Sequence, residues 1–203
     1  MKKILILILS ISILILALAF PASADAATHT VVKGDSMWKI AVKYQVGLSE
    51  LKSANPQIEN PALIYPGQKI NIPTLDGKVS SYEAEVVRLV NIEREKNGLS
   101  ALKADWELSR VARYKSQDMK DKNYFSHTSP TYGSPFQMMK SFGISYRTAG
   151  ENIAKGYATP EAVVKGWMNS SGHRANILNK SFTHIGVGYV QSGNYWTQMF
   201  ISK

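Results

Sequence analysis

Three side chains in the C-terminal half of the chain could move protons or bind a metal ion. His127 follows Tyr-Phe-Ser, Glu151 lies in a Gly-Glu-Asn sequence, and His173 lies in a Gly-His-Arg sequence. Two imidazoles and one carboxylate suit zinc and leave one position for water. The same three residues could serve a hydrolase, with Glu151 as the general base. The spacing contains no local zinc motif such as H-E-x-x-H.

Each of these residues also has a structural interpretation. Glu151 could accept backbone N–H bonds in a tight loop, and His173 could lie at a helix end. Asn152 and Asn176 could satisfy other backbone groups of the loops. His184 lies in a strand-like alternation, where a paired surface histidine is commoner than a metal ligand. The residue types alone leave both interpretations open.

Nucleophilic catalysis by serine or cysteine is not indicated. Ser126, Ser170 and Ser171 lie close to histidines in sequence, but there is no G-x-S-x-G elbow and no evident third group to orient a base. The chain contains no cysteine, which excludes thiol nucleophiles, Cys-ligated metals and disulfides. Its stability must therefore come from a packed core.

The first 26 residues predict export. Met1-Lys2-Lys3 gives a positive start, residues 4–20 are apolar apart from two serines, and residues 21–26 offer two Ala-x-Ala cleavage sites. We interpret residues 1–26 as a signal peptide. The apolar run is long for that role and slightly short for a spanning helix, so an uncleaved anchor is the alternative. In both cases the remaining chain lies outside the membrane and meets it only through this segment.

Composition and charge indicate a globular protein of the cell exterior. The chain has 203 residues, 44% of them hydrophobic and 19% charged, which suits one ordinary domain plus a small module. Its formal net charge is +9. An exported basic protein meets the phosphate-rich polymers of a Gram-positive wall, so we expect such a surface rather than nucleic acid as its partner. A general role of the charge in solubility is the alternative.

Residues 29–73 carry the pattern of a small module. Residues 29–33 and 68–73 alternate as two short strands, and apolar residues recur at helical spacing over 37–44 and 48–54. The predicted order is strand, helix, helix, strand, with the two strands paired. His29, at the start of this module, gives no indication of a function.

This module resembles a LysM domain. The resemblance rests on three motifs, Val32-Lys33-Gly34-Asp35-Ser36, Asn55-Pro56 and Ile64-Tyr65-Pro66-Gly67-Gln68. It implies binding to N-acetylglucosamine-containing glycans, above all peptidoglycan, in a shallow groove between two loops. The glycan-binding residues are then Gly34, Asp35, Ser36, Met37, Ile64, Tyr65, Pro66 and Gly67. Ser36-Met37 stands where Thr-Leu is usual, which predicts altered affinity; Asp35 and Ser36 could instead only cap the following helix.

A larger domain is expected over residues 82–203, after a polar linker at 74–81 that lets the two domains move independently. Ser80 and Glu83 are spaced as the capping box of its first helix. Further helices are predicted over residues 105–120, 134–142 and 160–169, and two strands joined by a hairpin over 184–190 and 195–201. Helices on both sides of a small antiparallel sheet would bury it.

The larger domain resembles the bacterial branch of the CAP superfamily, the cysteine-rich secretory protein, antigen 5 and pathogenesis-related 1 group. The blocks around His127, Glu151 and His173, followed by residues 183–189 and 195–200, come in the order of that family. The resemblance implies an α+β fold overall, a small βααβ LysM module followed by a three-layer α-β-α sandwich.

The family's central cleft carries two histidines and two glutamates able to hold a divalent cation. His127 matches the first histidine and Glu151 the first glutamate, but the other two positions fall on Ser170 and near Tyr195. His173, and also His184, could refill that cleft from other positions of the chain. A zinc site formed by His127, Glu151 and His173 is therefore a hypothesis.

Three functions remain open at this point. The first is a secreted, wall-associated protein that binds peptidoglycan through LysM and presents a His/Glu cleft for a further ligand. The second is a metal- or carboxylate-assisted wall hydrolase, and the third is a structural component of an envelope or spore coat. Lipid or sterol binding by the larger domain is compatible with the family but is not specified by these residues.

Overall fold

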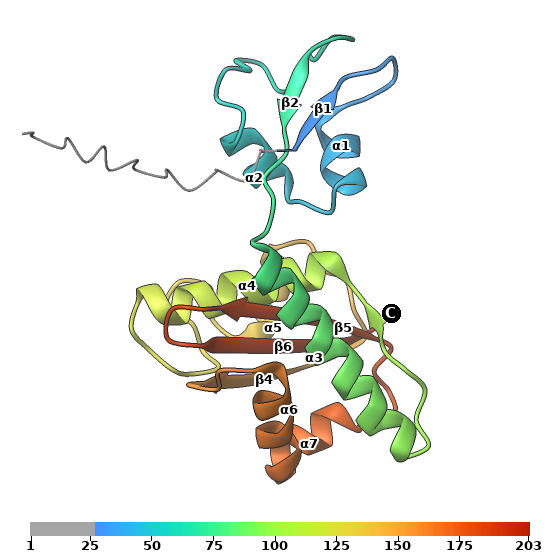
Figure 1. The fold of residues 1–203 in the computed structure, drawn as a ribbon, viewed down its shortest axis with the longest axis vertical. Coiled ribbons are helices and arrows are strands. Elements are labelled where there is room, and N and C mark those ends of the chain that lie inside the picture. Colours follow the sequence, from blue (N-terminus) through green and yellow to red (C-terminus); the bar gives the residue numbers. More distant parts are fainter. Residues whose placement is uncertain (1–26) are drawn as a thin grey trace, which may run out of the picture.

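The structure, a computed structural model, describes residues 27–203. The predicted signal peptide lies outside them. Within these residues, every helix is too short or too polar to span a lipid bilayer. The described chain forms an N-terminal module, residues 27–73, and a C-terminal domain, residues 77–203 (Figure 1).

The N-terminal module has the predicted order of elements. It consists of β1 (Thr28–Thr30), α1 (Met37–Lys43), α2 (Leu48–Ser53) and β2 (Lys69–Asn71). The two strands pair antiparallel, with His29 opposite Ile70. Ser36 caps α1 by accepting a hydrogen bond from the backbone N–H of Lys39. Apolar residues of both helices and of β2 form the core of the module.

The connection between the N-terminal module and the C-terminal domain, the two bodies of the structure, is shorter than predicted. The next helix, α3 (Gly77–Lys96), begins with Asp76 as its cap, because the Asp76 carboxylate accepts hydrogen bonds from the backbone N–H groups of Lys78 and Val79. The predicted capping box at Ser80 and Glu83 is therefore wrong, since both residues lie inside the helix. Residues 77–81 of the predicted linker are helical, and only residues 74–76 remain outside.

The C-terminal domain is built on a four-stranded sheet. Its strands are β3 (Lys103–Ala104), β4 (Thr148–Lys155), β5 (His184–Val190) and β6 (Tyr195–Ser202), in the spatial order β3-β5-β6-β4. β3 runs parallel to β5, and the other pairs are antiparallel. The predicted β5–β6 hairpin is present. Strand β4, which carries Glu151 at one edge of the sheet, was not among the predicted strands.

Helices cover both faces of this sheet, which confirms the α+β fold and the three-layer sandwich (Figure 1). α4 (Trp106–Asp121) and α5 (Pro135–Ser141) pack on one face. α3, α6 (Pro160–Asn169) and α7 (Ser171–Ile177) pack on the other, over a core that contains Trp167, Trp196 and Phe200. Trp196 and Phe200 are fully buried.

Two glycines let α4 approach the sheet closely. A Cβ atom at Gly188 would lie 2.1 Å from the backbone nitrogen of Arg113, and one at Gly186 would lie 2.4 Å from the carbonyl carbon of Leu108. Neither distance is possible for a real side chain. The backbone of α4 therefore rests on β5 itself, and this contact fixes the helix that precedes His127.

One ion pair joins the two bodies. The guanidinium of Arg110 on α4 donates from Nη2 to the Glu50 carboxylate, at 3.0 Å, and to the Ser49 hydroxyl, at 2.9 Å. On the other side it lies over the rings of Tyr114 and Phe142. Partial burial would raise the pKa of Glu50, but the hydrogen bonds from Arg110 and Ser49 outweigh burial and lower the pKa to about 2. The N-terminal module is thus held on α4.

Candidate functional site

His127 and Glu151 form a hydrogen-bonded pair at the β4 edge of the sheet. His127 lies in the loop between α4 and α5, residues 122–134, which we call the histidine loop. Glu151 lies in β4 opposite Met199 of β6, on the α4 side of the sheet. The distance from His127 Nδ1 to Glu151 Oε1 is 2.7 Å. The structure therefore brings together two of the three predicted site residues.

The two members of this pair differ sharply in exposure. The His127 side chain is 53% exposed and the Glu151 side chain only 1%. Glu151 Oε2 is buried, and no described group donates a hydrogen bond to it. Burial raises the pKa of Glu151, against the opposing effects of the hydrogen bond from His127 and the positive charge of Lys115. His127 is the member that can touch a ligand, while Glu151 orients it from beneath.

His173 lies near this pair without joining it. It occupies the first turn of α7, on the opposite face of the sheet. Burial lowers the pKa of His173, and an electrostatic effect of His127 lowers it further. Among residues 27–203, His173 makes no hydrogen bond or ion pair with Glu151. Its backbone oxygen instead accepts a hydrogen bond from Asn152.

The three predicted ligands do not form a zinc site. Across the described part of the chain, no three His, Cys, Asp or Glu side chains are placed to hold a metal ion. His127 directs Nδ1 at Glu151, and Glu151 is almost fully covered. A zinc ion needs three or four converging donors with an open position, and this arrangement supplies two groups that already bond each other. The residues present do not fit the metal hypothesis.

An amide network ties β4 to α7 beside the site. The Asn152 side chain donates to Gln198 Oε1 at 2.9 Å and accepts from Asn176 Nδ2 at 2.9 Å. Asn176 also donates to the backbone oxygen of Glu151. Asn152 and Asn176 each donate to a backbone carbonyl, as expected, but these carbonyls belong to α7 and β4 and not to loops. The network fixes the strand segment from which Glu151 projects.

The remaining polar candidates lie elsewhere or make local contacts. His184 begins β5 and its Nδ1 lies 2.7 Å from the Thr183 hydroxyl, while burial and Lys203 lower its pKa. Ser126 accepts a hydrogen bond from the backbone of Thr128. Among the described residues, no serine hydroxyl is hydrogen-bonded to His127 or His173. The geometry gives no nucleophile for a serine hydrolase.

The two predicted glycan-binding loops meet in the N-terminal module. Gly67 N–H donates to the Val31 oxygen, and Val31 N–H donates to the Gln68 oxygen, so the second loop is fastened to the strand that leads into the first. Gly34 and Gly67 both adopt positive φ, near +93° and +92°. Figure 1 places the loops before α1 and before β2 at the end of the module that is remote from the C-terminal domain.

Exposed apolar side chains surround these loops. Val32, Leu63 and Tyr65 are 58%, 51% and 55% exposed. Met37, by contrast, has its side chain in the module core at 3% exposure, so it cannot contact glycan as predicted. Its bulk supports the loop from below.

His29, which the sequence did not single out, supports the first loop. It is buried, and its Nε2 lies 2.8 Å from Asp35 Oδ2 while its Nδ1 lies 3.1 Å from the Tyr44 hydroxyl. The same Asp35 oxygen accepts the backbone N–H of Val32. This backbone bond and the bond with His29 lower the pKa of Asp35 despite some desolvation. Asp35 therefore shapes the loop, whatever else it contacts.

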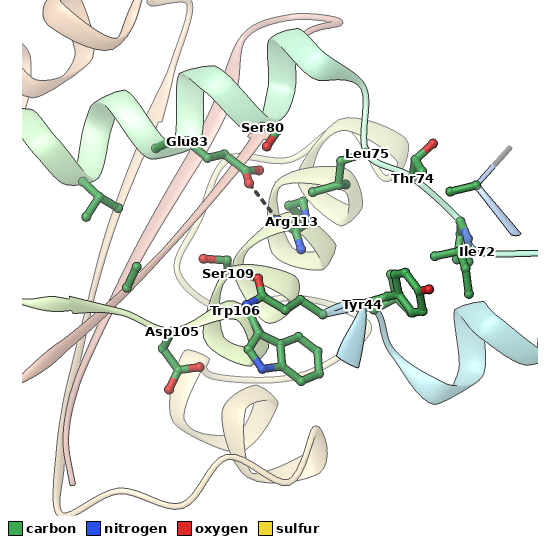
Figure 2. A pocket seen from close by; sticks show the side chains of 17 residues that line it. Tyr44, Ile72, Thr74, Leu75, Ser80, Glu83, Asp105, Trp106, Ser109 and Arg113 are labelled. Atoms are coloured by element: carbon green, nitrogen blue, oxygen red, sulfur yellow. Dashed lines mark hydrogen bonds and ion pairs between the residues drawn. The ribbon is translucent and has the colours of Figure 1, made fainter. Parts of the chain in front are cut away.

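A crevice of about 520 Å³ separates the two bodies (Figure 2). Tyr44 lines it from the N-terminal module and Trp106 from α4. On the side of the C-terminal domain, Glu83 Oε2 accepts a hydrogen bond from Arg113 at 2.7 Å, and Glu83 Oε1 accepts the backbone N–H of Tyr189. None of His127, Glu151 and His173 lines this crevice, which makes it a feature separate from the His127–Glu151 pair.

Parts of this chain are similar to known proteins. YkwD of Bacillus subtilis (strain 168) is 69% identical over 137 residues, which are 67% of this chain and 53% of that protein. Spore coat assembly protein ExsA of Bacillus cereus is 54% identical over 46 residues, 23% of this chain and 7% of that protein. The chain thus spans about half of YkwD and a small part of ExsA.

A solved structure shares the fold. An extracellular protein containing an SCP domain, from Bacillus anthracis str. Ames, aligns with a TM-score of 0.60 at 37% identity, over 68% of this chain and 47% of that one. Residues 29–73 match the LysM domain, and residues 87–201 match the cysteine-rich secretory protein family, CAP. With more than half of its length matched, the chain belongs to the CAP, or cysteine-rich secretory protein, family and carries a LysM domain ahead of its CAP domain.

Proposed function

We propose that this protein is exported to the cell wall, where the N-terminal module binds the N-acetylglucosamine-containing glycan of peptidoglycan and the C-terminal domain presents the His127–Glu151 pair to a further ligand. The LysM match supports the first part. Residues 1–26 act as the export signal in this proposal, in agreement with the extracellular SCP-domain protein of Bacillus anthracis. Residues 74–76 connect the two functional parts.

The observation that carries the glycan proposal is the junction of the two loops. Backbone bonds through Val31 hold the loops together, and both glycine turns leave open space where a side chain would otherwise stand. Tyr65 is exposed beside them. Loop N–H and C=O groups can bond the acetamido group of the sugar, while apolar side chains cover its methyl group. The shallow groove between the loops that the LysM resemblance implies would suit a polymer that extends beyond the protein on both sides.

Sedimentation with purified sacculi tests this proposal. Tyr65→Ala should reduce the bound fraction about tenfold, since it removes the exposed aromatic contact. Phe136→Ala is the matched control, because Phe136 is a similarly exposed aromatic residue on the C-terminal domain and should leave binding unchanged. Equal binding by the Tyr65 variant and the parent would contradict the proposed groove.

The geometry of the pair also favours a second candidate, a wall hydrolase. A carboxylate that holds Nδ1 of an exposed imidazole leaves Nε2 free to act as a general base. His127 then replaces Glu151 as the group that meets the substrate, because the Glu151 side chain is covered. Glu151 would keep the ring oriented and stabilise its protonated form, and the attacking group would be water.

Release of soluble fragments from dye-labelled sacculi separates the two candidates. A hydrolase should release dye, and both His127→Ala and Glu151→Gln should abolish the release without unfolding the protein. A binding protein should pellet with the sacculi and release nothing above the level of a heat-inactivated sample. Release that survives both substitutions would exclude this pair as its source.

The similarity to the spore coat protein does not favour a coat function. It covers 46 residues, about the length of one LysM domain, so it supports the shared glycan-binding module and says nothing of the C-terminal domain.

A further inference from the structure

A lysine lies fully buried beneath the histidine loop. Lys115 on α4 has no exposed surface. Its ammonium group donates hydrogen bonds to the backbone oxygens of Ser126 and His127, both at 2.8 Å, and to the Tyr124 hydroxyl at 3.3 Å. All three acceptors belong to the histidine loop. A buried ammonium is costly unless its donors are satisfied, and here the loop satisfies all three.

A buried aspartate lies one turn further along the same helix. Asp118 accepts hydrogen bonds from the hydroxyls of Tyr124, Ser129 and Thr131, each at 2.6 Å. Burial would raise its pKa, but these bonds and the charge of Lys115 outweigh burial and lower it. Residues three apart lie on the same face of a helix. Lys115 therefore binds the histidine loop at residues 124, 126 and 127, and Asp118 binds it at residues 124, 129 and 131.

The charge of Lys115 also acts on the carboxylate of the site. Burial lowers the pKa of Lys115, while the negative charges of Glu151 and Asp118 oppose that effect. The same attraction favours the ionised form of Glu151, which accepts the hydrogen bond from His127. One ammonium thus contacts the backbone of His127 and provides the positive charge beside its partner.

We propose that Lys115 is a positioning residue of the His127–Glu151 pair. It fixes the backbone at residues 126–127 so that the imidazole reaches Glu151, and it stabilises the buried carboxylate that orients the ring. Packing alone does not explain a lysine here, because a methionine would fill a similar volume. A methionine would, however, leave the backbone oxygens of Ser126 and His127 without this donor. The inference rests on the proposed role of His127 as the ligand-facing group.

Two substitutions separate the charge of Lys115 from its hydrogen bonds. Lys115→Met removes both, whereas Lys115→Gln keeps a donor and removes the charge. Ser129→Ala is the matched control, because it removes one bond between the loop and Asp118 and leaves Lys115 intact. Each variant is first checked for folding by circular dichroism and thermal unfolding.

The readout is nitrogen NMR of the His127 imidazole together with amide exchange of the histidine loop. In the parent protein we expect Nδ1 to carry the proton that is hydrogen-bonded to Glu151. Lys115→Met should lose that proton signal and exchange the amides of residues 126–131 about tenfold faster. Lys115→Gln should slow loop exchange relative to Lys115→Met but still lose the signal. Ser129→Ala should be less stable than the parent and keep the signal.

Two results would overturn the proposal. One is a folded Lys115→Gln or Lys115→Met protein whose imidazole signal equals that of the parent. The other is loss of the signal in Ser129→Ala to the same degree, which would show that any loosening of the loop suffices. If Lys115→Met does not fold, Lys115→Gln and the control decide. The measurement needs no ligand, so failure of sacculus binding would not affect its outcome.

Discussion

The exposed imidazole of His127 and the covered carboxylate of Glu151 have different roles in the pair. A ligand can reach only the imidazole, and its orientation depends on a carboxylate that solvent barely reaches. From sequence, Glu151 was the expected general base. In the proposed function His127 contacts the ligand instead, because the Glu151 side chain in β4 is covered.

Glu83 makes a pH-dependent contribution to stability. Burial raises its pKa to about 7, against the opposing effects of Arg113 and the Tyr189 N–H. A carboxyl group with a raised pKa in the folded state stabilises the fold below its unfolded value of about 4.5, and that contribution is lost as the pH rises through 7. Between pH 4.5 and pH 8, the parent should therefore lose about 3 kcal/mol of unfolding free energy relative to Glu83→Gln. Urea denaturation at a series of pH values measures this, and parallel curves for the two proteins would contradict it.

Sequence reasoning found His127 and Glu151 but missed the residues that support them. Lys115 was not singled out from the sequence. A signal was available, because Lys115 follows Val111 by four positions and so falls on the apolar stripe of α4. No sequence pattern indicated the role of His29, because its contact with Asp35 forms only in the folded chain.

Strand β4 was not predicted from the sequence, and neither were β3 and α7. Residues 150–154 combine a glycine, a glutamate and an asparagine with only two apolar residues, which matches neither strand alternation nor helical spacing. Tertiary contacts hold it instead, namely pairing with β6 along its whole length and the amide network to α7. Helices α4, α5 and α6 and the β5–β6 hairpin were predictable because their apolar periodicity is regular.

Close packing of α4 on β5 predicts a large effect at one glycine. Gly188→Ala should destabilise the C-terminal domain by about 3 kcal/mol or more, because the new methyl group meets backbone atoms of α4 that cannot yield. Gly172→Ala is the matched control, since its Cβ would meet open space within α7, and should be neutral or stabilising by up to about 1 kcal/mol. Thermal unfolding of both variants tests the contrast, and equal melting temperatures would argue against the packing.

At the scale of the whole molecule, Arg110 is predicted to fix the relative orientation of the two bodies. Arg110→Gln should let them tumble with different rotational correlation times in nitrogen NMR relaxation, whereas the parent should show one. Arg88→Gln is the control, because Arg88 forms its ion pair within α3. The pair is partly exposed, so its loss should cost only about 1 kcal/mol. A single correlation time in the Arg110 variant would contradict this prediction and would mean that contacts other than the ion pair hold the two parts together.

Acid should release the same contact. The lowered pKa of Glu50 means that its contribution is present above about pH 4.5 and is lost as the pH falls toward 2. Separate tumbling should therefore appear in the parent as the pH falls through that range. Glu50→Gln should tumble in the same way at pH 4 and pH 7, and a parent protein that stays rigid at pH 2 would exclude Glu50 as the sensitive group.

The short connection at residues 74–76 limits how far the glycan loops and His127 can move apart. With the glycan loops at the far end of the N-terminal module and His127 on the C-terminal domain, a held orientation sets a constant span between them. A protein bound to one glycan strand would then sample wall material only at that span. Neighbouring strands at the matching separation would be within reach, so the spacing of the wall itself would decide where the proposed second site meets its ligand.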